Sequence, residues 1–238
     1  MNNGYGSSHS ESIYSNSEYL THNPSWHVEH SAWKAMHVSR MLERNAIRPT
    51  RIVEVGCGAG EVLAQVKKAF PEAHLVGYEI SPQAFDLCRS RERDGLEFRN
   101  RSIAEDTDTY DLLMCLDVFE HVDDYIGFLR SLRERANWKI FHIPLDVSAQ
   151  SVFRGSPLLD IRRSVGHLHH FTAATAIDTL RYCGYEILES CYTGGSIDFA
   201  DRGWKAQVMK LPRKLLFGVA PNLCVRVLGG WSLMVLTR

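Results

Sequence analysis

Residues 51–63, with the sequence RIVEVGCGAGEVL, constrain the fold of this chain more than any other stretch. A short apolar run gives way to closely spaced glycines and then to helix-forming residues, which predicts a strand, a tight turn and a helix. Gly56, Gly58 and Gly60 allow the backbone to turn sharply and to approach a ligand with no Cβ atom in the way. The segment therefore predicts a βα unit with a ligand site at the carboxyl end of its strand.

Two carboxylates flank this turn and indicate what it binds. Glu54 precedes the first glycine, and Glu61 stands where a dinucleotide fingerprint would carry its last glycine. A carboxylate at the start of a helix disfavours an anionic pyrophosphate. The pair therefore favours a cationic or amine-bearing ligand, and an ordinary βα turn is the alternative.

The run E-V-G-C-G-A-G, residues 54–60, resembles the first motif of the class I S-adenosylmethionine-dependent methyltransferases. The resemblance implies that Glu54 faces the methionine end of the cofactor across the glycine turn. It also implies that the turn residues Gly56, Cys57, Gly58 and Gly60 contact the cofactor.

The next expected strand, HLVGYE at residues 74–79, ends in an acid 25 positions after Glu54. A doubly wound nucleoside site places the acid that binds the ribose hydroxyls at the end of its second strand. We therefore expect Glu79 to bind the ribose and Ile80 to lie beside the adenine. A solvated acid at a strand end is the alternative for Glu79.

A loop at residues 102–106 follows the short strand expected at 96–99. In the resembling family this loop carries an acid near the adenine amino group, usually in a Gly-Asp-Ala run, but here the sequence is R-S-I-A-E. We expect the loop to contact the cofactor through Ser102 and Ile103. The backbone amides of Ile103 and Ala104 would substitute for the missing aspartate, with Glu105 a weaker candidate.

The most strand-like run of the chain, residues 110–117, leads into the sequence D-V-F-E-H-V. This segment resembles the fourth-strand motif of small-molecule methyltransferases of the ubiquinone and arsenite type. Because ligands bind at the carboxyl ends of the strands of a doubly wound sheet, we expect Leu116, Asp117, Val118 and His121 to line the cavity. A turn-capping role for Asp117 and a structural role for His121 are the alternatives.

Three histidines occur in four residues in G-H-L-H-H-F, residues 166–171, after a stretch that we expect to be irregular from 145 to 168. No acidic residue lies nearby at ligand spacing, so the sequence predicts no metal site. In similar methyltransferases a histidine here faces the acceptor. The resemblance therefore implies that His167 and His170 are acceptor contacts or a general base, and His121 is the third candidate base.

The two ends of the chain are expected to cover the core. A helix over residues 27–45 would pack a stripe of aromatic and histidine side chains on the domain, or act as a lid whose Trp26, His27, Trp33 or Lys34 reaches the ligand. Before a closing strand at 231–237, the basic and apolar residues of 201–217 form an insertion. Weak contact with a membrane surface is one interpretation of it, and we prefer a cap over the acceptor site.

Composition limits the remaining possibilities. A chain of 238 residues fits one principal domain, which we divide into a mobile N-terminus and lid (1–50), a cofactor-binding core (51–192) and a cap with the closing strand (193–238). A net charge of -1 gives no electrostatic case for nucleic acid. The six cysteines form no C-x-x-C pair, and no long apolar run or leader occurs, so we expect a cytoplasmic protein in a reducing compartment.

Together these patterns predict an α/β fold with a doubly wound, mostly parallel seven-stranded, Rossmann-like sheet, its strands beginning near residues 51, 75, 96, 111, 139, 186 and 231. The resemblance implies methyl transfer from S-adenosylmethionine to a small-molecule acceptor, by O- or N-methylation of a sugar, phenol or amine. A non-catalytic cofactor-binding domain and a nucleotide-dependent oxidoreductase are the alternatives. The oligomeric state is not predicted.

Overall fold

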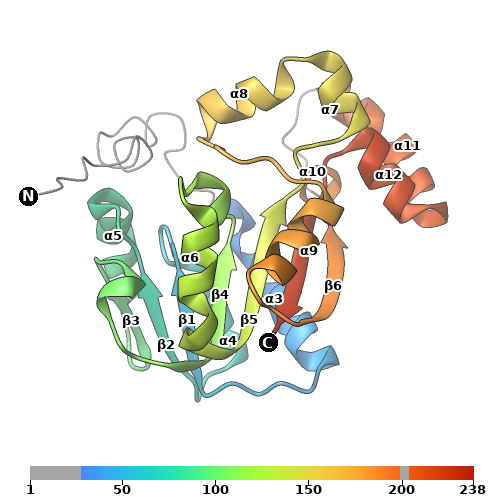
Figure 1. Ribbon diagram of the computed structural model, residues 1–238. Helices are drawn as coiled ribbons and strands as arrows, with labels where there is room; N and C mark the ends of the chain where they lie inside the picture. The colour runs from blue at the N-terminus through green and yellow to red at the C-terminus, as the bar shows by residue number, and fades with distance from the viewer. Residues whose placement is uncertain (1–27, 199–203) are drawn as a thin grey trace, which may run out of the picture.

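A seven-stranded sheet with helices on both faces forms the centre of the computed structural model, which describes residues 28–198 and 204–238 (Figure 1). The strand order is β3-β2-β1-β4-β5-β7-β6. Strands β1 to β5 pair in parallel, whereas β7 is antiparallel to both of its neighbours, β5 and β6. The predicted doubly wound, mostly parallel sheet with an antiparallel closing strand is therefore confirmed.

The strands are, in chain order, β1 (Arg51–Val55), β2 (His74–Tyr78), β3 (Leu96–Arg99), β4 (Tyr110–Leu116), β5 (Ala136–Pro144), β6 (Ile187–Thr193) and β7 (Ser232–Thr237). The α-helices are α3 (Ser31–Arg44), α4 (Glu61–Ala69), α5 (Pro82–Arg89), α6 (Tyr125–Leu132), α7 (Ala149–Arg154), α8 (Pro157–Ser164), α9 (Ala173–Tyr182), α10 (Gly195–Asp198), α11 (Trp204–Val219) and α12 (Pro221–Leu228). Short 3₁₀ helices occupy η1 (Val28–His30), η2 (Ile103–Glu105), η3 (Phe119–His121) and η4 (Arg133–Arg135).

Both faces of the sheet are buried, which explains why its central strands are almost continuously apolar. Neighbouring residues point to opposite faces, so Ile52 joins one core cluster and Val53 the other. The first cluster includes side chains from α3, α4 and α5, and the second includes side chains from α6 and α9. The strand order changes direction between β1 and β4, and the carboxyl ends of these two strands form the crevice where such sheets bind ligands.

Local sequence signals set several helix starts. The Ser81 hydroxyl accepts a hydrogen bond from the Ala84 amide, and Pro82 occupies the first turn of α5. Thr172 caps α9 in the same way. These caps satisfy backbone donors that a helix leaves without an internal partner.

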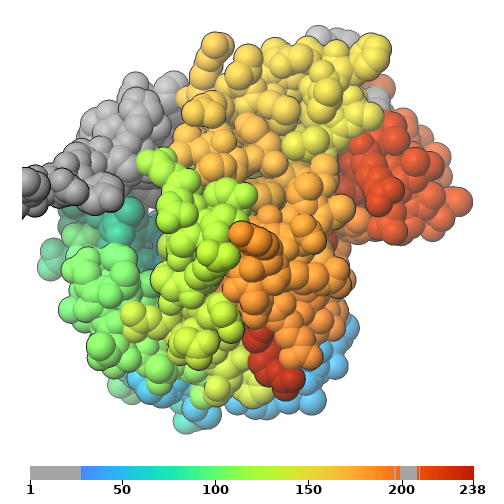
Figure 2. Space-filling model, viewed as in Figure 1, coloured from blue at the N-terminus to red at the C-terminus, as the bar shows by residue number. Residues whose placement is uncertain are grey.

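The connection between β5 and α9 differs from the prediction. The irregular stretch expected at residues 145–168 contains α7 and α8. Ser148 caps α7 by accepting from the Ser151 amide at 3.1 Å, and Pro157 lies in the first turn of α8. The space-filling view shows this segment, in yellow and light orange, covering the end of the molecule above the sheet (Figure 2).

The ends of the chain pack on this core. Helix α3 buries Val38, Met41 and Leu42 in the cluster on its side of the sheet. Trp26 and His27, two of the proposed lid residues, lie outside the described residues. The division into segments 1–50, 51–192 and 193–238 stays a prediction.

The segment before the closing strand contains two helices, α11 and α12. Helix α11 continues through Pro212, and its exposed apolar residues include Leu211 and Leu215. None of the helices in the described part of the chain has the length and apolar character needed to cross a membrane. The weak membrane contact considered for residues 201–217 stays a prediction.

Candidate functional site

The glycine turn after β1 is built as predicted from backbone that only glycine adopts easily. Gly56, Gly58 and Gly60 all have positive φ values. A Cβ atom on Gly56 would lie 2.8 Å from Cγ2 of Val118, so the turn packs directly against the segment after β4. The amides of Gly56 and Cys57 both donate to the Tyr78 carbonyl, which ties the turn to β2.

A cavity of about 1030 Å³ opens beside this turn, at the carboxyl ends of the parallel strands. It is lined by all but one of the predicted cofactor-binding residues, namely Glu54, Gly56, Cys57, Gly58, Glu79, Ile80, Ser102, Ile103, Leu116, Asp117 and Val118. Gly60 is the exception, because it lies at the N-cap of α4, where a Cβ atom would meet Phe98 and Cys88. Of the three candidate bases, His121 and His167 line the cavity and His170 does not.

Glu54 and Glu79 are both buried in the wall of this cavity. Glu79 is held by backbone amides, since its Oε2 accepts from Gly58 and its Oε1 accepts from Ser81, each at 2.8 Å. Oε2 of Glu54 has no hydrogen-bond partner among the described residues. Burial raises the pKa of Glu54 to about 8, an effect that Lys34 opposes and Glu79 increases.

Several polar groups of the loop after β3 form hydrogen bonds within the loop. The Ser102 hydroxyl accepts from the Ala104 amide, and the Glu105 carboxylate accepts from the Ser102 amide. These bonds form a capping box around η2. Ser102 and Ile103 line the cavity, whereas Ala104 and Glu105 do not. The substitution of these groups for the missing aspartate stays a prediction.

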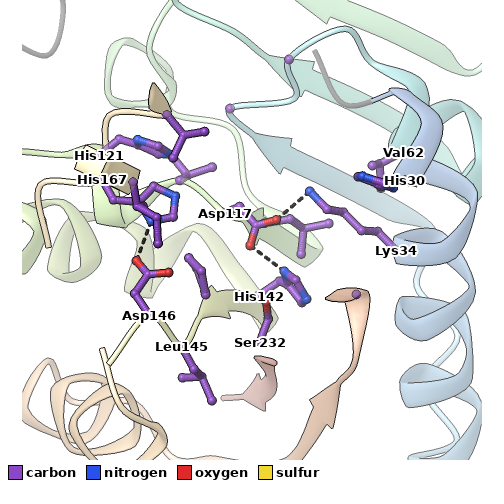
Figure 3. A pocket seen from close by; sticks show the side chains of 18 of the residues that line it. His30, Lys34, Val62, Asp117, His121, His142, Leu145, Asp146, His167 and Ser232 are labelled. Carbon is purple, nitrogen blue, oxygen red and sulfur yellow. Dashed lines mark hydrogen bonds and ion pairs between the residues drawn. The ribbon is translucent and has the colours of Figure 1, made fainter. Parts of the chain in front are cut away.

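Asp117 lies at the centre of the cavity wall, between a lysine and a histidine (Figure 3). Its Oδ2 is 2.6 Å from Nζ of Lys34, and its Oδ1 is 2.6 Å from Nδ1 of His142. Nε2 of His142 lies 2.8 Å from the Thr193 hydroxyl. Burial alone would raise the pKa of Asp117, but His142 and Lys34 hold it well below its usual range.

Lys34 therefore connects helix α3 to the cavity, which supports the lid interpretation of this helix. Trp33 also lines the cavity, and its indole N–H donates to Asp198 of α10 at 2.9 Å. Sequence reasoning named Lys34 as a candidate but missed His142. The signal was present in β5, where a histidine stands among apolar residues near the carboxyl end of a central strand.

The histidines after α8 form a cluster with an aspartate. Oδ2 of Asp146 is 2.6 Å from Nδ1 of His167 and 3.0 Å from Nδ1 of His170. The His167 ring also packs edge-on against the His121 ring, with centroids 4.9 Å apart (Figure 3). Burial and, to a smaller extent, the neighbouring His167 lower the pKa of His121 to about 4.

Acidic residues do lie beside these histidines in the fold, contrary to the reason given from the sequence for predicting no metal site. The sequence offered no acid near the three histidines, but the fold brings Asp146 to His167 and His170, and Glu120 to His121 and His167. In each of the two groups one ligand atom per residue lies within 4.8 Å of the others. Sequence reasoning missed Asp146 because α7 and α8 separate it from the histidines along the chain.

The sheet order, the glycine turn between two buried carboxylates and the cavity beside it define a class I S-adenosylmethionine-dependent methyltransferase. Residues 26–190 match the sequence profile of the methyltransferase domain. The chain belongs to this family.

One relative with a curated description is the ubiquinone biosynthesis O-methyltransferase of Hahella chejuensis, 28% identical over 112 residues that cover 42% of this chain and 46% of that protein. The matched stretches span between a third and about half of the curated relatives' own lengths.

Solved structures share the fold along most of the chain. Magnesium protoporphyrin IX methyltransferase from Synechocystis PCC 6803, with bound SAM, has a TM-score of 0.62 at 14% identity, with 98% of each chain covered. The plantazolicin methyltransferase BpumL, in complex with a desmethylPZN analog and SAH, has a TM-score of 0.61 at 16% identity, with 96% of this chain and 92% of that chain covered.

Proposed function

We propose that this chain transfers the methyl group of S-adenosylmethionine to a hydroxyl or amine of a small-molecule acceptor. One observation carries the proposal: a single cavity extends from the buried carboxylates Glu54 and Glu79 to the Asp146–His167 pair. Its volume of about 1030 Å³ is at the upper end of the range for ligand pockets, roughly 300–1,000 Å³, which leaves room for a cofactor and an acceptor together.

Glu54 and Glu79 would hold the two ends of the cofactor. The Glu54 carboxylate lacks a partner for Oε2, and the ammonium group of the methionine moiety would supply one. Glu79 is already oriented by two backbone amides, so its remaining lone pairs can accept from the ribose hydroxyls. Ile80 is 55% exposed and would be covered by the adenine.

Methyl transfer needs mainly the correct positioning of two reactants, because a lone pair on the acceptor attacks the methyl carbon in line with the departing sulfur. A hydroxyl or ammonium acceptor must also lose a proton. The His167 ring is suited to take it, since Nδ1 donates to Asp146 and the carboxylate would stabilise the imidazolium that forms. His121, with a pKa of about 4, would remain neutral at pH 7 and line the acceptor pocket.

The relatives support a broad range of acceptors. The name of the Hahella chejuensis protein specifies O-methylation in ubiquinone biosynthesis, and the solved structures include a porphyrin methyltransferase and the plantazolicin methyltransferase. A hydroxyl acceptor agrees with the His167–Asp146 pair, because oxygen needs a base more often than a neutral amine does. We therefore favour O-methylation over N-methylation.

Calorimetric titration with S-adenosylhomocysteine tests the cofactor half of the proposal, with saturable binding as the expected result. A matched titration with NAD should show no binding, and the reverse pattern would favour an oxidoreductase. Transfer of labelled methyl groups to a panel of phenols, sugars and amines then tests the acceptor half. Binding without turnover on any member of the panel would favour a non-catalytic cofactor-binding domain.

A further inference from the structure

Glu120 is a buried carboxylate that none of the functions above uses. It is fully buried, and neither Oε1 nor Oε2 has a hydrogen-bond partner among the described residues. A carboxyl group without a hydrogen-bond partner in a protein interior is costly unless it is protonated, paired with a cation or bound to a metal. The nearest cationic candidate among the described residues is the His121 ring at 3.9 Å. The backbone of Glu120 is fixed at the same time, because its carbonyl accepts from the amides of Leu168 and His169.

We propose that Glu120, His121 and His167 form a binding site for a divalent transition-metal ion at the acceptor end of the cavity. The three residues offer one carboxylate oxygen and two ring nitrogens, and these ligand atoms lie within 4.8 Å of one another. Ligands of a tetrahedral zinc ion, at about 2.0–2.2 Å from the metal, lie roughly 3.4 Å apart. Binding would therefore draw the ligand atoms together by at most about 1.4 Å.

The hydrogen bonds of His121 and His167 fix the tautomer of each ring and place its lone pair on Nε2. A carbonyl oxygen can only accept, so Nδ1 of His121 donates to Gly166 at 3.0 Å, and the ring lone pair is on Nε2. Nδ1 of His167 donates to Asp146, which puts its lone pair on Nε2 as well. A carboxylate or carbonyl behind a ligating histidine is the usual outer partner in metal sites, because it fixes the tautomer and the ring orientation.

A second group, Asp146, His167 and His170, shares His167 with the first. Its carboxylate is already committed, because Oδ2 of Asp146 lies within hydrogen-bond distance of both histidines. Metal binding there would break these bonds, whereas binding at Glu120 would use a carboxylate that has no hydrogen-bond partner among the described residues. We therefore assign the ion to the first group, with Asp146 as the outer partner of His167.

Two histidines and one carboxylate leave coordination positions open, the arrangement that catalytic zinc and non-haem iron sites share. The His121 and His167 side chains line the cavity, so an acceptor can reach these positions. With the ion bound, the Nε2 lone pair of His167 would be occupied, so the ion would replace His167 in promoting loss of the acceptor proton. That proton would pass to water in the cavity, and the acceptor oxygen could then attack the methyl group. This catalytic role rests on the proposed function, but metal binding itself does not.

Cobalt is a direct probe, because Co²⁺ bound by histidine nitrogens in a four- or five-coordinate site absorbs visible light. Titration of the metal-free full-length chain with Co²⁺ should give a saturable spectrum at one equivalent, which Zn²⁺ should abolish by competition. Glu120→Gln and His121→Ala should each weaken Co²⁺ binding by more than about 100-fold. Asp146→Asn should weaken it by roughly 10–100-fold, as loss of an outer partner does.

His170→Ala is the matched control, and the same Co²⁺ affinity as in the unaltered chain is expected. Loss of binding in this variant, with binding kept in Glu120→Gln, would overturn the assignment in favour of the second group. A chain that binds S-adenosylhomocysteine normally but gives no Co²⁺ spectrum would overturn the metal site and leave the proposed function standing. A Co²⁺ spectrum without S-adenosylhomocysteine binding would support the metal site and overturn the proposed function. For each metal-site variant, normal S-adenosylhomocysteine binding shows that the chain is folded.

Discussion

Asp117 and His142 are joined twice, once through the backbone and once through their side chains. The Asp117 amide donates to the His142 carbonyl at 2.9 Å, and Oδ1 of Asp117 is 2.6 Å from Nδ1 of His142. This double connection holds Asp117 in a left-handed conformation, with φ at +58°, that residues other than glycine rarely adopt. It also aims the second carboxylate oxygen at Lys34 of helix α3.

We predict that Lys34→Met destabilises the protein through this contact. The substitution keeps the aliphatic stem but removes the ammonium group 2.6 Å from a mostly buried carboxylate, so the free energy of unfolding should fall by about 1–3 kcal/mol. Urea denaturation measures the change. Lys68→Met is the control, because Lys68 is exposed on α4, and its change should stay within about 0.5 kcal/mol. Equal effects of the two substitutions would contradict the proposed contact.

Cofactor binding should release a proton from Glu54. With a pKa of about 8, most of this carboxyl is protonated at pH 7, and pairing with the cofactor's ammonium group would lower its pKa. Calorimetry with S-adenosylhomocysteine in buffers of different ionisation enthalpy should then detect release of close to one proton at pH 7. Glu54→Gln should bind more weakly and release none. Unchanged proton release in Glu54→Gln would assign the proton to another group.

The same carboxyl makes the stability of the cofactor-free protein depend on pH. In the unfolded chain Glu54 ionises near its ordinary pKa of 4.5, whereas in the folded chain it keeps its proton up to about pH 8. The folded state therefore binds more protons between these values, so the contribution of Glu54 to stability decreases as pH rises from about 4.5 to about 8. Glu54→Gln should remove this part of the pH dependence, as thermal unfolding at several pH values would measure.

Glu79→Ala should weaken S-adenosylhomocysteine binding severalfold or more. The substitution removes the proposed ribose acceptor and leaves the amides of Gly58 and Ser81 without their carboxylate partner. His121→Ala, at the other end of the cavity, should leave the calorimetric affinity for S-adenosylhomocysteine nearly unchanged. Intact affinity in Glu79→Ala would remove the ribose assignment.

Gly56→Ala should be more damaging than Gly155→Ala. Both glycines have positive φ, but a Cβ atom on Gly56 meets Val118 at 2.8 Å, whereas no atom lies within 4 Å of one on Gly155. Gly155→Ala should therefore cost only the backbone term of roughly 1–2 kcal/mol. Gly56→Ala should cost more and should also weaken cofactor binding, because Val118 must move. Equal decreases in thermal stability for the two variants would show that backbone strain, and not the contact with Val118, accounts for the loss in Gly56→Ala.

The residues around the glycine turn could be placed at one cavity because they follow strands that the sequence marks clearly. Glu54 and Glu79 end two neighbouring parallel strands, so their approach follows from the order of a doubly wound sheet. Gly60 does not line the cavity, and glycine spacing alone does not distinguish a residue that contacts a ligand from one that makes room for Phe98 and Cys88.

The acceptor half could not be predicted in the same way. His142 lies within an apolar strand, where a single polar residue has no pattern of its own. Asp146 precedes α7 and His167 follows α8, and the two residues meet because this connection folds back on itself. Such long-range contacts depend on the path of a connection, which periodicity does not encode.

Residues 145–167 supply much of the acceptor wall from one uninterrupted connection, including Asp146, Gln150, Arg154, Ile161 and His167. The predicted cofactor-binding residues come instead from the ends of β1, β2 and β4 and from the loops that follow β3 and β4. Under the proposed function, replacing this connection with that of another methyltransferase should therefore change which acceptor is methylated and leave S-adenosylmethionine binding unchanged. Part of the choice of acceptor would then depend on the polypeptide between β5 and α9, together with His121 and the residues of α12 and β7 that also line the cavity.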